Sequence, residues 1–447
     1  MEEGMLVILH GWSDSAASFK RLGQKLVALG VAPQVVNVRL GDYVTLDDDV
    51  TYADLTRAMM RAWQNEPALK DAAPGSVDAV VHSTGGLVIR DWMTTYFTPA
   101  SCPLKRILML APANFGSPLA HKGRSFVGRI VKGFNSSKPF QTGEIILKGL
   151  ELASPYSFAL AGRDCFARDA WYGPGRILAT VLVGTKGYTG ISAAANEDGG
   201  DGTVRVSTAN LNAHKFSLDF SDTPSRPVPE TTPMNGRTAF LRIPGENHST
   251  IAMKDGGPKV DDTEGRIVEA LRVTDADFEA YCDRLDALSE SNRSKEAAET
   301  YTHGFQNTVV RLSDDAGADI EDYFLEIFAK HPSGNVDDRV TAKLQKHFIN
   351  TVHPYEDNAS YRSLLCDVTW LRENIPDREL YFSITAMPNV KEKGNVVGYE
   401  TFGWDDIGSF GATRDDLKGI FVPDRTLLLD IKLKRAQRDK VFGFVRL

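Results

Sequence analysis

The sequence predicts an α/β domain with a mainly parallel sheet, followed by a β-rich domain. Strand and helix patterns alternate through the first half of the chain. From about Val273 this alternation stops, and strand patterns with a period of two residues become frequent. The length of 447 residues also suits two domains, at least one of which can bury a substantial core.

The alternation begins at Met5–His10, a continuous apolar run that is typical of a strand buried on both faces. Further strand patterns follow in order at Val35–Leu40, Ser76–His82, Arg106–Pro112, Ile177–Gly184 and Thr238–Ile243. Helix patterns separate the early strands, at Ala16–Leu29, Tyr52–Trp63 and Gly86–Tyr96. After the strand pattern at Arg106–Pro112 the alternation lapses, and it resumes at about Gly175. We therefore expect a first domain over residues 1–272, with a helical cap inserted at about 117–175.

A polar, charged helix pattern at Asp275–Thr300 marks the end of the first domain, and we expect a helical linker over 273–300. Beyond it, apolar residues recur at every second position in Leu380–Ala386 and in Leu427–Leu433, and the positions between them are mixed. One apolar face and one mixed face are typical of antiparallel strands with one side in a core. The sequence thus predicts a β-rich domain over 301–447, with an antiparallel, sandwich-like arrangement.

Composition and charge exclude several classes of protein. The chain is 42% hydrophobic and 25% charged, which is ordinary for a globular protein. Its net charge of −8 argues against a general nucleic-acid binder. The four cysteines are scattered without a CxxC pair, which favours free thiols in a reducing compartment. With no secretory signal and no apolar run long enough to span a bilayer, we expect a cytoplasmic protein; export without a signal peptide is compatible with this pattern.

The segment from Asp78 to Leu87 carries the strongest signal for function. It reads as a buried strand, then Ser83 at a sharp turn, then Gly85 and Gly86 at the start of a helix. A strand-to-helix turn presents a serine hydroxyl at the carboxyl edge of a sheet, beside backbone N–H groups. A serine needs a base to become a nucleophile, and the base needs a carboxylate to orient it.

Candidates for both partners follow later strands, in the order serine, aspartate, histidine. Asp201 follows Ile177–Gly184, and Asp198 in the same turn is the competing acid. These aspartates could instead be solvated turn residues or a weak calcium site. His248 follows Thr238–Ile243 and is the expected base. His10 and His82 flank the predicted site and are expected to pack beside it.

Developing negative charge on the substrate requires backbone N–H donors near the nucleophile. Thr84 directly follows Ser83, at the start of the helix, and supplies the first expected donor. The second is the Trp12 N–H, in the loop after the first strand, where Gly11 permits a tight turn.

Five short motifs occur together: His-Gly at 10–11, His-Ser-Thr-Gly-Gly at 82–86, Asn-Phe-Gly-Ser-Pro-Leu at 114–119, Asp-Gly-Thr-Val at 201–204 and Asn-His-Ser at 247–249. This set resembles the bacterial lipase/esterase branch of the α/β-hydrolase superfamily, over residues 1–271. The resemblance implies a serine carboxylic-ester hydrolase with Ser83, Asp201 and His248 as triad and with Trp12 and Thr84 as oxyanion donors. The chain departs from the family pattern at Val81, where Gly or Ala is usual two residues before the serine.

The expected function is therefore hydrolysis of lipid-like or other apolar acyl esters through an acyl-enzyme, with no metal or organic cofactor. The same triad would also serve a phospholipase A or an acyltransferase. A binding protein on an inactive hydrolase scaffold is a third interpretation.

Two further segments suggest contact with lipid. Apolar residues at helical spacing in Phe126–Phe134 lie within the basic stretch 122–148. We expect a lid that contacts an anionic lipid surface, or alternatively a core-facing helix with a solvated basic side. For the C-terminal domain, docking to lipid or to a partner protein is one hypothesis, and a stabilising or oligomerising role is the other.

Overall fold

The structure is a computed structural model. It describes residues 5–9, 19–32, 34–38, 49–120, 144–221, 230–300, 302–330, 335–375, 380–402 and 419–437. The chain divides into two compact units: residues 1–213 with 234–303, and residues 214–233 with 304–447. Trp12 and Phe126–Phe134 lie outside the described residues, so the structure does not address the second oxyanion donor or the expected lid.

The first unit is built on a six-stranded sheet in the order β2-β1-β3-β4-β5-β8, with every neighbouring pair parallel. Its strands are β1 (Met5–Leu9), β2 (Gln34–Val38), β3 (Val77–His82), β4 (Leu104–Leu110), β5 (Leu178–Gly184) and β8 (Ala239–Ile243). Its main helices are α1 (Lys20–Ala28), α3 (Tyr52–Asn65), α4 (Gly85–Tyr96), α6 (Glu144–Leu150), α7 (Pro155–Arg163), α8 (Val206–Ala209), α9 (Thr263–Ala270) and α10 (Phe278–Thr300). These elements confirm the predicted α/β core, with ends shifted by a few residues.

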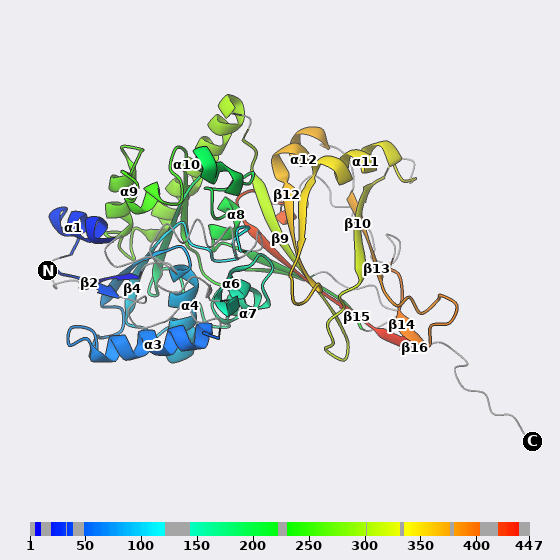
Figure 1. The fold of residues 1–447 in the computed structure, drawn as a ribbon, viewed down its shortest axis with the longest axis horizontal. Coiled ribbons are helices and arrows are strands. Elements are labelled where there is room, and N and C mark those ends of the chain that lie inside the picture. Colours follow the sequence, from blue (N-terminus) through cyan, green and yellow to red (C-terminus); the bar gives the residue numbers. More distant parts are fainter. Residues whose placement is uncertain are drawn as a thin grey trace, which may run out of the picture. The chain divides into compact units, whose positions relative to one another are not determined.

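Helices cover both faces of this sheet. Figure 1 shows α3 and α4 on one face, and α1, α9 and α10 on the other. The central strands are therefore buried on both sides, and all seven residues of β5 are buried. On α3, Leu55, Met59 and Trp63 recur at helical spacing and are buried. The Trp63 ring packs against that of Trp92 on α4, with centroids 4.8 Å apart.

The polar helix α10 belongs to the first unit, where a linker was expected. It packs beside β8: the Ser289 hydroxyl donates to the Phe240 carbonyl (3.2 Å), and Arg242 on β8 pairs with Glu296 (2.6 Å). One charged residue of the helix, Glu296, is thus an ion-pair partner of the sheet. The helix is an outer layer of the α/β core.

The second unit contains a six-stranded sheet in the order β11-β12-β9-β15-β6-β7. Its strands are β6 (His214–Phe220), β7 (Glu230–Pro233), β9 (Phe305–Asp314), β11 (Ile349–Pro354), β12 (Tyr361–Asp367) and β15 (Thr426–Leu433). The unit also holds two-stranded sheets of β10 (Tyr323–Ala329) with β13 (Leu380–Ala386) and of β14 (Val397–Tyr399) with β16 (Arg435–Gln437), and two helices, α11 (Asp338–His347) and α12 (Val368–Asn374). The β-rich prediction is confirmed.

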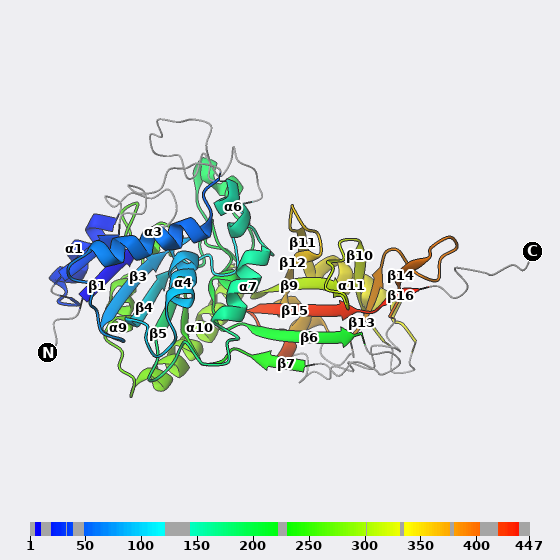
Figure 2. The same ribbon diagram turned by 90° about the horizontal axis from the view of Figure 1, so that it is seen from below.

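The large sheet of the second unit is mixed, where an antiparallel arrangement was expected. β15 runs parallel to both of its neighbours, β9 and β6, and the remaining pairs are antiparallel. Figure 2 shows β9, β15, β6 and β7 side by side. β6 and β7 come from residues 214–233, within the range expected for the first domain. They join the second unit because the alternating apolar face of β6, with Phe216, Leu218 and Phe220, is buried in its core.

Candidate active site

Ser83 occupies the turn between β3 and α4. Its backbone is left-handed, with a φ of 55°, which a non-glycine residue adopts only when the surrounding structure holds it there. The Ser83 N–H donates to the Leu110 carbonyl (3.2 Å), and the Ser83 carbonyl accepts from the Ala113 N–H (3.2 Å). These two bonds tie the serine to β4 and the loop after it, so the turn is fixed.

The departure at Val81 does not prevent this turn. Val81 lies buried on β3, in register with Leu9 and Met109 on the neighbouring strands. The close approach falls instead at Gly86, where a Cβ atom would lie 2.8 Å from the Pro112 Cβ. A side chain at position 86 would therefore push α4 away from the loop after β4.

Three side chains meet at the carboxyl edge of the parallel sheet. Ser83 Oγ lies 3.1 Å from His248 Nε2, and His248 Nδ1 lies 3.0 Å from Asp201 Oδ2. Asp201 is fully buried and His248 nearly so. A carboxylate accepts only, so Nδ1 carries the proton and the Nε2 lone pair faces the serine. This is the tautomer that a general base needs.

The loop after β5 holds the Asp201 carboxylate from behind. Asp201 Oδ1 accepts hydrogen bonds from the Thr203 N–H (2.9 Å) and the Val204 N–H (2.8 Å), which leaves Oδ2 directed at His248. The competing Asp198 is exposed at the surface. Between the two aspartates considered, the structure brings Asp201 to the histidine.

The loop after β8 holds His248. Asn247 Oδ1 accepts from the Ser249 N–H (3.0 Å) and the Thr250 N–H (2.9 Å), and the His248 N–H donates to the Asp201 carbonyl (3.2 Å). These bonds fix the turn in which the imidazole sits, on both sides of the residue.

His82 supports His248 from within β3. It is buried, and its Nε2 lies 2.9 Å from the His248 carbonyl oxygen, so this nitrogen is the donor. The two imidazole rings have centroids 4.6 Å apart. The sequence predicts that His82 packs beside the site, and the structure gives it this contact with the backbone of His248. His10, which was expected to pack there too, lies outside the described residues.

Thr84 begins α4 directly after the serine and is buried. Within the described part of the chain, no group accepts a hydrogen bond from its N–H. That N–H therefore retains its donor capacity beside Ser83 Oγ.

The segment 114–119 braces the site. The Asn114 amide donates to the Ala209 carbonyl (2.7 Å), the Phe115 N–H to the Thr208 carbonyl (2.9 Å), and the Ser117 hydroxyl to the Thr203 carbonyl (2.5 Å). This buried segment thus connects the serine turn with the loop that carries Asp201.

Sequence reasoning missed two residues that shape the site. Glu246 is fully buried, and its Oε1 accepts from the Lys259 N–H and the Val260 N–H (both 2.8 Å) and from the Thr263 hydroxyl (2.9 Å). It anchors the loop two residues before the histidine. A buried glutamate bonded to backbone groups far along the chain has no local pattern, so the sequence carries no signal for it.

The second missed residue is Tyr188, whose hydroxyl shares a hydrogen bond with Thr203 (3.0 Å). Burial, with a smaller contribution from the charge of Asp201, raises the pKa of Tyr188 to about 12. The phenol is therefore neutral at physiological pH. A side chain at Gly202 would meet this ring at 2.6 Å, so the glycine next to Asp201 is required by close packing as well as by its φ of 98°.

Among the residues that the structure describes, no group of three or more His, Cys, Asp or Glu side chains is placed to hold a metal ion. The four cysteines are buried free thiols. None of the helices in the described part of the chain is long and apolar enough to cross a bilayer.

No protein-family model matches the sequence, and no curated protein does. Among solved structures, phospholipase PlaB from Legionella pneumophila has a TM-score of 0.82 and 26% sequence identity, over 99% of this chain and 96% of that one. The same protein in complex with thio-NAD gives a TM-score of 0.81 and 25% identity over 99% and 96%. This chain belongs to the α/β-hydrolase superfamily, and within it to the carboxylic ester hydrolases. A lipase from Bacillus licheniformis, BlEst2, matches at a TM-score of 0.36 and 15% identity over 61% of this chain and 93% of that one.

Proposed function

We propose that the protein is a serine hydrolase that cleaves the acyl ester bonds of phospholipids. The observation that carries this proposal is the hydrogen-bonded series from Ser83 through His248 to Asp201. It lies at the sheet edge where α/β enzymes place their catalytic groups. The choice of phospholipid rests on the similarity to a phospholipase over nearly the whole of both chains.

In the proposed first step, Ser83 Oγ attacks the ester carbonyl carbon while His248 Nε2 takes the hydroxyl proton. The imidazolium that forms is stabilised by Asp201 Oδ2 at Nδ1. As the tetrahedral intermediate collapses, the bond to the leaving alcohol breaks, and His248 returns its proton to that oxygen. An acyl group then remains on Ser83.

In the second step a water molecule replaces the alcohol. His248 removes a proton from the water, the resulting hydroxide attacks the acyl carbon, and Ser83 leaves with the proton back on Oγ. The products are a fatty acid and a lysophospholipid. In both steps the Thr84 N–H donates to the carbonyl oxygen as it becomes negative, and the proposed second donor is the Trp12 N–H.

The direct test compares the wild type with Ser83→Ala on phosphatidylcholine or phosphatidylglycerol vesicles, with fatty-acid release as the readout. We expect kcat to fall by roughly a million-fold, as for other serine nucleophiles in triads. Ser76→Ala is the matched control, since Ser76 is exposed just before the same strand. A fluorophosphonate probe should label the wild type and fail to label the Ser83→Ala variant. Retained turnover in that variant would refute the proposed nucleophile.

The substrate assignment is tested separately. Cleavage of a p-nitrophenyl ester without fatty-acid release from phospholipid would contradict the phospholipid proposal but keep the ester hydrolase. Adding a competing alcohol distinguishes hydrolysis from acyl transfer, because a transferase forms the new ester in place of free fatty acid.

A further inference from the structure

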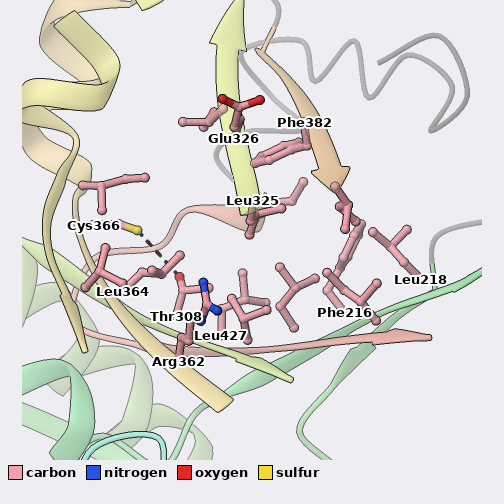
Figure 3. A pocket seen from close by; sticks show the side chains of 18 of the residues that line it. Phe216, Leu218, Thr308, Leu325, Glu326, Arg362, Leu364, Cys366, Phe382 and Leu427 are labelled. Atoms are coloured by element: carbon pink, nitrogen blue, oxygen red, sulfur yellow. Dashed lines mark hydrogen bonds between the residues drawn. The ribbon is translucent and has the colours of Figure 1, made fainter. Parts of the chain in front are cut away.

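The second unit holds an apolar cavity of about 240 Å³ between two of its sheets. Its floor is one face of the large mixed sheet, and the opposite wall comes from β10 and β13 (Figure 3). Registered pairs make up the floor: Leu364 lies opposite Thr308, and Leu429 opposite both Phe216 and Val310. Because paired residues share a face, the strands present one continuous apolar surface.

Several of these residues lie where a close-packed sandwich would bury them fully. Leu364 and Leu429 are on interior strands of the sheet and face the second sheet, yet both are only half-buried. Leu325 and Phe382 on the opposite wall are also only half-buried. Native interiors rarely leave such voids, and an engineered apolar cavity of about 150 Å³ already binds benzene. The cavity is therefore large enough to take a hydrocarbon group.

The lining has few polar atoms, and these are arranged in a way that selects a ligand. The Thr308 hydroxyl already pairs with Cys366 Sγ at 3.8 Å. Glu326 accepts from the Ser383 hydroxyl, and Figure 3 shows its carboxylate directed away from the cavity. Among the described residues of the lining, the remaining charged group is Arg362, on the floor.

Arg362 is held rigidly by backbone carbonyl groups. Its guanidinium donates to the carbonyls of Ala359 (3.1 Å), Tyr323 (2.8 Å) and Glu321 (2.7 Å), and it lies 3.7 Å from the centre of the Tyr323 ring. No carboxylate of the described residues forms an ion pair with it. Of its five N–H groups, three are used in these bonds, so donor capacity remains for an anion.

At the edge of the cavity, Phe324 and Val352 expose apolar surface, at 58% and 54% of their accessible area. Large exposed apolar side chains beside an apolar cavity are typical of an entrance for an apolar ligand.

From these features we infer that the cavity binds a free long-chain fatty acid, with the hydrocarbon tail between the two sheets and the carboxylate at Arg362. The tail matches the apolar lining, and the single negative charge matches Arg362, the one fixed cation among the described residues of that lining. This inference does not depend on the chemistry of Ser83, although a fatty acid is also a product of the proposed reaction.

The test measures binding of cis-parinaric acid, a fluorescent fatty acid, to the full-length Ser83→Ala variant. Leu364→Trp fills the cavity, and we expect it to weaken binding at least about tenfold. Val396→Trp is its matched control, because Val396 is exposed elsewhere in the same unit. Palmitic acid should compete for the site.

Arg362→Gln keeps the cavity and removes the charge. We expect it to weaken binding of the acid about tenfold and to leave binding of its methyl ester unchanged. Arg311→Gln is the matched control: Arg311 lies on β9 next to Val310, so it projects from the opposite face of the sheet. If Leu364→Trp does not fold, the comparison of the acid with its methyl ester in Arg362→Gln still tests the inference.

Unchanged affinity in both variants would assign the probe to another site and overturn the inference. Equal loss of acid and ester in Arg362→Gln would overturn the carboxylate assignment. A crystal structure with the cavity filled by another segment of the chain or by a second copy would overturn the fatty-acid site itself.

Discussion

The two six-stranded sheets of this protein are assembled from the chain in different ways. In the first unit all neighbouring strands are parallel, and β3, β4 and β5 lie side by side in chain order. In the second unit β15, near the end of the described chain, pairs with β6, which precedes β8 of the other unit in the sequence. Both sheets contain strands with clear apolar patterns. In the first sheet β3 and its neighbour β4 are consecutive strands joined through α4, whereas β15 in the second sheet pairs with β6 and β9, which lie far earlier in the sequence.

The two sheets also differ in what their ends and faces carry. The parallel sheet collects three polar side chains at one edge, and each of them is hydrogen-bonded. The mixed sheet presents an apolar face to a cavity. Parallel strands place their carboxyl ends together by topology, so loops distant in sequence meet there. A mixed sheet has no such common edge, so the site proposed for the second unit lies on a face of its sheet.

The strongest test of the site formed by Ser83, His248 and Asp201 compares the variants Asp201→Asn and Asp198→Asn. We expect kcat to fall about 10⁴-fold in Asp201→Asn, because an amide at that position no longer favours the tautomer with a proton on His248 Nδ1. Asp198 is exposed, and its substitution should leave kcat unchanged. Both rates can be measured on a p-nitrophenyl ester. Similar losses in the two variants would contradict the assignment of the acid.

The same contrast explains what could be predicted from the sequence. The serine turn, the order of acid and base, and the strands before them follow from local patterns together with the rule for parallel sheets. The choice of Asp201 over Asp198 came from the motif Asp-Gly-Thr-Val, and the structure shows why that motif matters. The N–H groups of Thr203 and Val204 hold the carboxylate.

Other features depend on contacts between distant parts of the chain. Period-two patterns indicate that a strand has an apolar face, but they do not identify its partner, so the parallel pairing of β15 and the transfer of residues 214–233 to the second unit were not foreseen. The helix α10 reads as polar because polar residues are among those that contact β8: its Ser289 and Glu296 bond to Arg242 on that strand. Glu246 depends on hydrogen-bond donors that only the folded loop brings together.

Matched core substitutions would show whether the two sheets also unfold separately. Leu108 on β4 and Leu312 on β9 are both fully buried. Replacing either with alanine should lower the free energy of unfolding of its own unit by roughly 2–5 kcal/mol. We expect two transitions in urea, each shifted by only one variant, and an unchanged kcat for Leu312→Ala at low urea. A single transition that both variants shift would show that the units unfold together.

His82→Phe tests the support that β3 gives to the base. Phenylalanine keeps a ring beside Phe19 and His248 but cannot donate to the His248 carbonyl. A buried hydrogen bond worth about 1 kcal/mol predicts roughly a fivefold loss in kcat with little change in KM. Steady-state kinetics on a soluble ester would measure both. A loss as large as that of Asp201→Asn would mean that His82 contributes more than a backbone contact.

The smallest expected effect concerns the second unit and acid. His214 on β6 is buried, and its Nε2 donates to the Ile420 carbonyl (2.9 Å). Burial, with a smaller effect of Arg425, lowers the pKa of His214 below its ordinary value of 6.5. Below pH 6.5 the unfolded chain therefore binds this proton more readily than the folded unit does, so stability decreases as the pH falls from 7 toward the lowered pKa. His214→Gln retains a donor without this titration, and its unfolding transition should shift less between pH 7 and about pH 5.5. The kcat for ester hydrolysis at pH 7 should be the same in the wild type and in His214→Gln. If the unfolding transition of the variant shifts equally between pH 7 and about pH 5.5, His214 is excluded as the source of the shift.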